Sequence, residues 1–215
     1  MIGANQYNAV LRDSISHSWW QQETGKAIAG PLKGKLLKEV PAKQSSLSYW
    51  VNQHPASLIL QADILYENAY AVFDAYEKSA FRSNAMQTDT ATYAAKSLVV
   101  GVVKKNEAKA YDWNKLRYKK VVEDSIAGTP LLITVSNDNT TFHMFKRSVH
   151  NKALAFKAAD SAGLIRDKQT ESLWNVNGSC IEGQLAGAQL QEIEAYQETR
   201  QSWENFHPDS FEYGF

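Results

Sequence analysis

Short runs of β-branched and aromatic residues recur through the second half of the chain. Turn-forming residues separate them at 105–106, 127–130 and 137–139, and this alternation is typical of antiparallel strands. The predicted strands are Leu98–Lys104, Val121–Ile126, Leu131–Val135, Phe142–Lys146 and Leu154–Lys157. The fold class that this pattern predicts is α+β, predominantly antiparallel β, with a few short helices.

Helical periodicity is confined to short stretches. Apolar residues at helical spacing predict an amphipathic helix over 64–79. Two shorter helices are expected at Ser46–Gln53 and Thr199–Phe206, because each begins at an N-cap residue type and is followed by a His-Pro pair. The stretch 82–96 is rich in Thr, Ala, Ser and Asn, and it is the best candidate for a linker.

One passage occurs twice in the chain, about 153 residues apart. The matching pairs include Arg12 and Arg166, Asp13 and Asp167, Ser18 and Ser172, Trp20 and Trp174, Gly25 and Gly178, Gly30 and Gly183, Gly34 and Gly187, Trp50 and Trp203, and His54 and His207. A single deletion after Trp174 keeps both copies in register. This repetition predicts two related repeat units. Residues 1–80 would hold the C-terminal part of a first unit and a connecting helix, 81–96 a linker, and 97–215 a second, degenerate unit.

The predicted strands that precede the second copy have no counterpart before the first. They begin near residue 98, whereas the first copy begins near residue 12. A sheet without its partner strands has an unpaired edge and an uncovered apolar face. We therefore expect that the chain is the C-terminal part of a longer protein, or that the first copy takes its strands from elsewhere. Upstream strands of the same protein are one candidate partner.

Composition narrows the classes of partner. The 215 residues carry 23 basic and 23 acidic side chains, so the formal net charge is zero and nothing favours nucleic acid or an anionic membrane. No segment of the sequence has the length and apolarity of a membrane span. Cys180 is the single cysteine, which excludes an internal disulfide and a multi-cysteine metal site. Its counterpart in the first copy is Ala27, so we expect a buried, unreactive thiol.

Candidate chemistry is sparse. The histidines His17, His54, His143, His150 and His207 form no His-x-His or His-Glu-x-x-His pattern, so no zinc site is expected. A candidate polar and aromatic pocket comprises Asn8, Asp13, Trp19 and Asp167. The alternative for each aspartate is structural. Asp13 and Asp167 precede a Ser or a Thr by three residues, and an aspartate in that position can close a turn on backbone NH groups.

The tryptophans have different expected roles. Neighbouring residues of a strand point to opposite faces, so Trp19 and Trp20 cannot both be buried against one core. Trp20 and Trp174 are expected to be equivalent core anchors. Trp19, whose counterpart is Leu173, is then a candidate for an exposed platform, and such a platform could bind a sugar ring.

Both copies carry the elements of a known motif. The first has Asp13, Ser18-Trp19-Trp20, Gly25 to Gly30 and Gly34, and the second has Asp167-Lys168, Thr170, Ser172 and Trp174. These residues resemble the bacterial domain of unknown function 3179, whose passage runs Asp-Arg-x-Thr-x-Ser-x-Trp, then Gly-x-Ala-x-x-Gly, then a Trp and His-Pro. The first copy resembles the C-terminal half of one such domain, and the second resembles a degenerate copy.

The resemblance also implies where chemistry would lie. The family carries a Cys-x-x-Cys and a preceding His, and these positions fall on Ser136, Asn139 and Lys119. A hydroxyl, an amide and an ammonium group are poor ligands for soft metals and have no thiol chemistry. We therefore expect no catalytic, cofactor-binding or metal-binding residue in this chain.

Three hypotheses about function follow. The first is a non-enzymatic binding or structural module of a longer exported protein, which the resemblance would place in the periplasm or elsewhere outside the cytoplasm. The second is a fragment of a metal- or thiol-dependent redox protein or enzyme whose Cys-x-x-Cys site lies upstream of Met1. The third is a carbohydrate-binding module that uses an exposed tryptophan.

Overall fold

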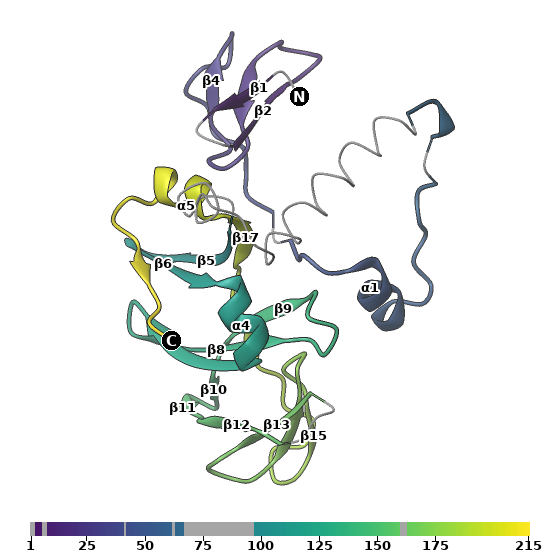
Figure 1. Cartoon of the computed structure of the whole chain (residues 1–215), viewed down its shortest axis with the longest axis vertical. Helices are drawn as coiled ribbons and strands as arrows, with labels where there is room; N and C mark the ends of the chain where they lie inside the picture. The colour runs from purple at the N-terminus through teal and green to yellow at the C-terminus, as the bar shows by residue number, and fades with distance from the viewer. Residues whose placement is uncertain (1–2, 6–7, 41, 62, 67–96, 160–162) are drawn as a thin grey trace, which may run out of the picture.

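The computed structural model describes residues 3–5, 8–40, 42–61, 63–66, 97–159 and 163–215 (Figure 1). Antiparallel sheets dominate this part of the chain, together with three short α-helices and one 3₁₀ helix. The expected α+β class is therefore confirmed. No helix within the described residues is long and apolar enough to cross a membrane.

Two small four-stranded sheets lie at opposite ends of the molecule (Figure 1). The N-terminal sheet contains β1 (Gly3–Asn5), β2 (Asn8–Arg12), β3 (Trp19–Gln21) and β4 (Ala27–Ala29). The C-terminal sheet contains β12 (Phe156–Ala158), β13 (Leu164–Asp167), β14 (Leu173–Asn175) and β15 (Cys180–Glu182). In each sheet the strands are antiparallel and follow the order of the sequence.

Two larger sheets form the middle of the molecule. The outer central sheet has the order β17 (Tyr196–Thr199), β5 (Leu98–Lys104), β6 (Glu107–Asp112) and β18 (Phe211–Glu212). The inner central sheet has the order β16 (Gln191–Glu192), β9 (Phe142–Lys146), β8 (Thr129–Val135) and β7 (Val121–Ile126). A short ribbon pairs β10 (Ser148–Val149) with β11 (Lys152–Ala153). The helices are α1 (Leu47–Gln53), α4 (Trp113–Lys119) and α5 (Arg200–Phe206), with the 3₁₀ helix η1 at Ile64–Tyr66.

The inner central sheet is covered on both faces. Ile133 and Met144 pack into a core shared with the outer central sheet and α4. Leu132 and Phe145, the neighbours of those residues along β8 and β9, pack into a separate core with the C-terminal sheet. Because successive side chains of a strand alternate between faces, a continuous apolar run such as that of β8 forms a strand buried on both sides.

Helix α5 covers the other face of the outer central sheet. Trp203 of α5 is buried against Val99 and Ala110 in a third, small core. The corresponding helix α1 has no buried residue, and its Trp50 is 39 % exposed. The two helices therefore share a sequence pattern, but only α5 packs its tryptophan against a sheet.

Both of these helices have the predicted caps. Ser46 Oγ accepts a hydrogen bond from the backbone NH of Tyr49, and Thr199 Oγ1 accepts one from that of Ser202. At the other end, the backbone NH groups of His54 and His207 donate to the carbonyl oxygens of Trp50 and Trp203 at 2.8 Å. Each imidazole also lies against the indole of its own helix, with ring centroids 4.3 and 4.2 Å apart.

Strand predictions differ from the structure in a few places. The bounds of β5, β7 and β9 agree with those predicted, whereas β8 begins earlier and β12 lies at Phe156–Ala158 instead of Leu154–Lys157. Leu154 instead donates its backbone NH to Arg147 and joins the core. Strands β6 and β17 and helix α4 were not predicted. The helix predicted at 64–79 coincides with η1 at its start, and its remainder, like the linker at 82–96, lies outside the described residues.

Candidate functional site

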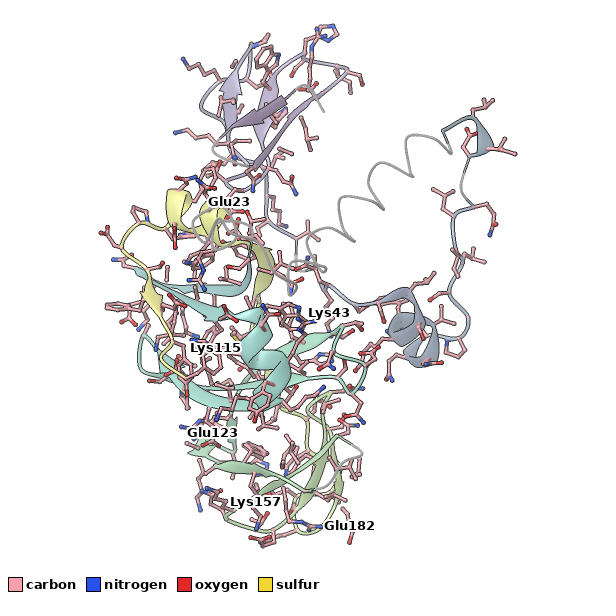
Figure 2. All side chains as sticks on the ribbon, viewed as in Figure 1. Glu23, Lys43, Lys115, Glu123, Lys157 and Glu182 are labelled. Carbon is pink, nitrogen blue, oxygen red and sulfur yellow. The ribbon has the colours of Figure 1, made fainter. Side chains whose placement is uncertain are left out.

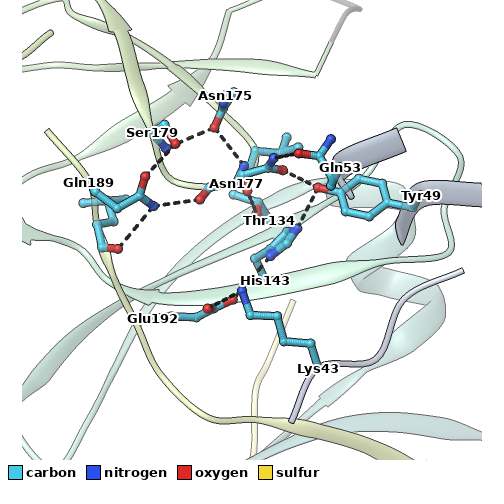
Figure 3. A network of polar contacts seen from close by, with 12 residues as sticks. Lys43, Tyr49, Gln53, Thr134, His143, Asn175, Asn177, Ser179, Gln189 and Glu192 are labelled. Carbon is cyan, nitrogen blue, oxygen red and sulfur yellow. Dashed lines mark hydrogen bonds and ion pairs between the residues drawn. The ribbon is translucent and has the colours of Figure 1, made fainter. Parts of the chain in front are cut away.

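A polar cleft lies where α1, the inner central sheet and the turn between β14 and β15 meet (Figure 3). His143 of β9 is at its centre and is 9 % exposed. The hydroxyl of Tyr49, on α1, lies 3.0 Å from His143 Nε2 and also hydrogen-bonds the side chain of Asn177. Asn177 Nδ2 in turn donates to Gln53 Oε1 at 3.0 Å. Segments from three parts of the chain therefore build one network.

Charged groups lie on the other side of the imidazole. Glu192 Oε1 is 3.5 Å from His143 Nδ1, and Glu192 Oε2 is 2.6 Å from Lys43 Nζ. Glu192 reaches this position because β16 pairs with β9, with Glu192 opposite Phe145. The imidazole therefore lies between a carboxylate and a phenol (Figure 3).

Burial determines the protonation states of His143 and Tyr49. It lowers the pKa of His143, an effect that Glu192 opposes by stabilising the charged ring. Burial also raises the pKa of Tyr49, and the nearby carboxylates of Asp138 and Glu192 raise it further. At neutral pH both groups are therefore uncharged. A carboxylate can only accept a hydrogen bond, so the proton of neutral His143 belongs on Nδ1, facing Glu192.

This tautomer has a consequence for Tyr49. With the proton of His143 on Nδ1, Nε2 is an acceptor and the Tyr49 hydroxyl donates to it. The hydroxyl also faces Oδ1 of Asn177, whose Nδ2 donates to Gln53, so its single proton serves two acceptors. Protonation of His143 would make Nε2 a donor to the Tyr49 oxygen, and the hydroxyl proton would then serve Asn177 Oδ1 alone. The contacts of Tyr49 are therefore fully satisfied when His143 is charged.

His143 lines two cavities. One, of about 330 Å³, is lined by Lys43, Glu192, Glu194 and apolar groups that include Met144 and Ile193. The other, of about 270 Å³, contains Tyr49 and Trp50 together with amides and hydroxyls. These polar groups are Gln44, Ser45, Gln53, Thr141, Asn177, Ser179 and Gln189. The second cavity is thus lined mainly by neutral donors and acceptors beside an aromatic wall, and its one lysine, Lys43, is paired with Glu192.

This lining suits a neutral polar molecule better than a metal ion. Within the described residues there is no group of three or more His, Cys, Asp or Glu side chains that could hold a metal. Amides and hydroxyls supply both donors and acceptors, which is the combination that orients small polar ligands in protein cavities.

The aspartates predicted as pocket candidates lie in turns of two different sheets. Asp13 accepts hydrogen bonds from the backbone NH groups of Ile15 and Ser16 and from Trp20 Nε1. The Ser16 hydroxyl donates to Asp13 as well, and this bond, followed by the others, lowers the pKa of Asp13. Asp167 accepts the corresponding set, from Gln169, Thr170 and Trp174 Nε1. Each aspartate closes its own turn, and the two do not share a pocket.

The other two pocket candidates also lie apart from the His143 cleft. Asn8 Nδ2 donates to Ser202 Oγ of α5 at 3.1 Å, and Trp19 is 45 % exposed on the N-terminal sheet. Glu23, in the turn between β3 and β4, accepts a hydrogen bond from Tyr196 at 2.7 Å and lies 3.5 Å from His207 Nε2 (Figure 2). These contacts join the N-terminal sheet to α5 and β17.

The predicted equivalence of two tryptophans is only half correct. Trp174 is fully buried, as expected of a core anchor. Trp20 is only partly buried, although its Nε1 makes the same hydrogen bond to an aspartate. The physical reason is that the inner central sheet covers Trp174, whereas no sheet of the described chain covers Trp20 in the same way.

The positions that the family resemblance assigns to thiols, Ser136 and Asn139, are structural here, and the position assigned to the imidazole, Lys119, is exposed at the end of α4. Ser136 is buried, and its Oγ donates to Asp138 while accepting from the backbone NH of Thr141. Asn139 has a positive φ of 61° in the same turn, and its Oδ1 accepts from Lys120 Nζ. Cys180 is buried at 4 % exposure, as predicted from its alignment with Ala27.

Sequence reasoning did not identify the residues of the cleft. Tyr49, His143 and Asn177 are each unremarkable in local pattern, and the two contacts of Tyr49 join residues 94 and 128 positions apart. The available signal was a histidine among the apolar residues Phe142, Met144 and Phe145, at a position where an unpaired imidazole would be costly to bury.

Comparison with known proteins gives a family and no function. No curated protein and no solved structure matches the chain. The model of the family described as "Protein of unknown function (DUF3179)" matches residues 5–210, which is nearly the whole chain. The match extends beyond the two copies and the strands on which the resemblance rested, and it does not divide the chain into a partial and a degenerate unit. The chain belongs to the DUF3179 family of proteins of unknown function.

Proposed function

We propose that this protein is a non-enzymatic binding module whose ligand occupies the cleft beside His143. The observation that carries the proposal is the 270 Å³ cavity, in which amides and hydroxyls face an aromatic wall and the charge of Lys43 is paired with Glu192. The ligand that this lining favours is a small, uncharged molecule with both hydrogen-bond donors and acceptors. A binding role fits better than catalysis, because neutral His143 and neutral Tyr49 are hydrogen-bonded to each other.

Ligand-dependent thermal stability tests this function. A panel of hexoses, N-acetylhexosamines and other neutral polar metabolites would be added to the full chain, and the melting temperature would be measured. A ligand present at a hundred times its dissociation constant stabilises the folded state by about 2.7 kcal/mol. Isothermal titration calorimetry would then measure the affinity of each ligand that raises the melting temperature.

Matched variants locate the binding site. Tyr49→Phe removes the hydroxyl at the centre of the cleft, and Asn177→Ala removes its amide partner. Tyr118→Phe is the control, because Tyr118 is 85 % exposed on α4 and lines no part of this cavity. The first two variants should weaken binding at least tenfold and the control should not. Equal affinities in all three would place the ligand elsewhere.

Trp19 supports a second candidate function, binding of a carbohydrate on the N-terminal sheet. Its indole is 45 % exposed on β3, and an exposed indole can stack on a sugar ring. Trp19→Ala would abolish such binding and leave the His143 cleft unchanged. Tyr49→Phe would do the reverse, so the two variants separate the candidates.

We also propose that the chain consists of two related units and that the protein is exported. Support for the first statement is the recurrence of the same strand order, aspartate turn, helix caps and Trp-His contact in the two segments. Support for the second is family resemblance alone. Fractionation of cells that produce the natural protein, followed by immunodetection, would test the location.

A further inference from the structure

The N-terminal and C-terminal sheets expose the same positions to different extents. Leu11 is 46 % exposed, whereas its counterpart Ile165 is 1 % exposed. Leu37 is 59 % exposed, whereas its counterpart Leu190 is 2 % exposed. The repeat therefore provides an internal comparison, in which one sheet shows its apolar face covered and the other shows it open.

The exposed positions form one continuous face. Leu11 is the register partner of Trp20, and Trp20 is the register partner of Ala27 on the next strand. Partners in register project to the same side of a sheet, and Leu37 contacts the turn at Gly25. Leu32 belongs to the same surface, because its counterpart Leu185 packs against the covered core. We call the surface formed by Leu11, Trp20, Leu32 and Leu37 the open face.

The inner central sheet shows what covers such a face. In the C-terminal sheet, Leu132 of β8 and Phe145 of β9 pack against Ile165, Trp174 and Leu190. The Phe145 ring approaches the turn so closely that a Cβ on Gly178 would lie 2.7 Å from it. At the corresponding Gly25, the three atoms nearest to such a Cβ all belong to Leu37. Among the described residues, none of these nearest atoms belongs to an aromatic ring such as that of Phe145.

The charge around the open face differs from that around its covered counterpart. Lys26, Lys33, Lys35 and Lys38 are exposed along 26–38, a stretch with no acidic residue. Their counterparts are Ser179, Ala186, Ala188 and Gln191, none of which is charged. Within the described residues, none of the four lysines forms an ion pair. Lys35 takes the position of Ala188, which packs against the covered core.

We propose that the open face is a docking surface for a partner protein that presents an apolar antiparallel strand pair flanked by carboxylates. The strand pair would take the place that β8 and β9 take against the C-terminal sheet, and its carboxylates would pair with the lysines, Lys35 above all. A second copy of the chain does not fit this description. Its own Leu132 and Phe145 are 0 and 1 % exposed beneath its own C-terminal sheet.

A synthetic strand pair serves as the probe. The peptide has the sequence of residues 129–146, is cyclised to hold the hairpin, and carries Thr134→Glu and His143→Glu. These positions pair with each other next to the Leu132 and Phe145 pair and share its face. Fluorescence anisotropy of the labelled peptide would measure its affinity for the full chain. We expect saturable binding that weakens as salt is added, and weaker binding of the peptide without the two glutamates.

Variants of the full chain assign the site. Leu37→Asp and Lys35→Glu should each weaken binding of the peptide at least tenfold. Ile15→Asp is the control, because Ile15 is 94 % exposed in the turn between β2 and β3 and lies off the open face. Hydrogen exchange would show whether amides 25–38 become protected when the peptide binds, and circular dichroism would verify that each variant is folded.

Three results would overturn the proposal. The first is absence of binding, or binding that Leu37→Asp leaves unchanged. The second is a homodimer of the chain alone that Leu37→Asp dissociates, which would assign the open face to a second copy. The third is binding to vesicles of anionic phospholipid that Leu37→Asp and Lys35→Glu abolish in the absence of any binding to the peptide, which would assign it to a lipid surface.

Discussion

Trp203 lies directly over Gly101. A Cβ placed on Gly101 would be 1.9 Å from Cζ3 of the Trp203 indole, which is far inside any van der Waals contact. The indole also donates from Nε1 to Ser210 Oγ at 2.8 Å, so it cannot easily move aside. The absence of a side chain at one position of β5 is therefore what allows α5 to pack on the outer central sheet.

Gly101→Ala should consequently destabilise the protein. Overpacking of a well-filled core costs about 1 to 3 kcal/mol and sometimes more, and here the added methyl meets a rigid ring. Gly214→Ala is the control, because nothing lies within 4 Å of that position. Urea denaturation would measure both variants, and equal midpoints would contradict the packing described for Trp203.

Three tryptophans lie in the N-terminal and C-terminal sheets, and the loss of stability on replacing each by alanine should follow its burial. Trp174→Ala should cost about 3 to 5 kcal/mol, the range for large aromatic truncations in a core. Trp20→Ala should cost less, because the open face leaves its ring partly exposed, and Trp19→Ala least of all. Denaturation midpoints give the order. A loss for Trp20→Ala as large as that for Trp174→Ala would mean that the open face is covered in solution.

Stability should decrease as pH rises through neutrality because of Glu198. Burial, with Glu23 nearby, raises the pKa of Glu198 from 4.5 to about 7 in the folded state. Between these values the folded chain binds more protons than the unfolded chain. The contribution of protonated Glu198 to the free energy of unfolding is therefore fully present below pH 4.5 and is lost as pH rises through about 7. Glu198→Gln should flatten the dependence of the melting temperature on pH between 5 and 8. Glu182→Gln, at an exposed position, should leave it unchanged.

Cys180 should be chemically inert in the folded protein. Its side chain is buried against Trp174 and Phe156, and burial raises the pKa of the thiol, so little thiolate is present at neutral pH. Reaction with a disulfide reagent such as Ellman's reagent should be slow in buffer and complete within minutes in concentrated urea. Rapid modification without denaturant would show that the C-terminal sheet opens readily.

Local pattern predicted much of the secondary structure. Strands β5, β7 and β9 are continuous apolar or alternating runs between turn residues, and the caps Ser46 and Thr199 mark the starts of α1 and α5. Helix α4 escaped prediction because only Trp113 and Leu116 are buried on it. Two apolar contacts do not make a recognisable amphipathic period.

The candidate site could not be predicted for a different reason. Tyr49, His143 and Asn177 come together only because α1, β9 and the turn after β14 pack side by side (Figure 3). Nothing in the spacing of these residues encodes that packing. The residues that sequence did single out, Asp13 and Asp167, are conspicuous because they repeat, and their hydrogen bonds serve turns within their own sheets.

Strand β8 belongs to two cores at once, through Leu132 on one face and Ile133 on the other. Neither core can lose its order without releasing the strand that completes the other. We therefore expect the four layers formed by α5, the two central sheets and the C-terminal sheet to melt as a single cooperative unit. In calorimetry the van't Hoff and calorimetric enthalpies of this unit should agree. Truncation of Leu132 to alanine should lower the melting temperature of one shared transition instead of splitting it into two.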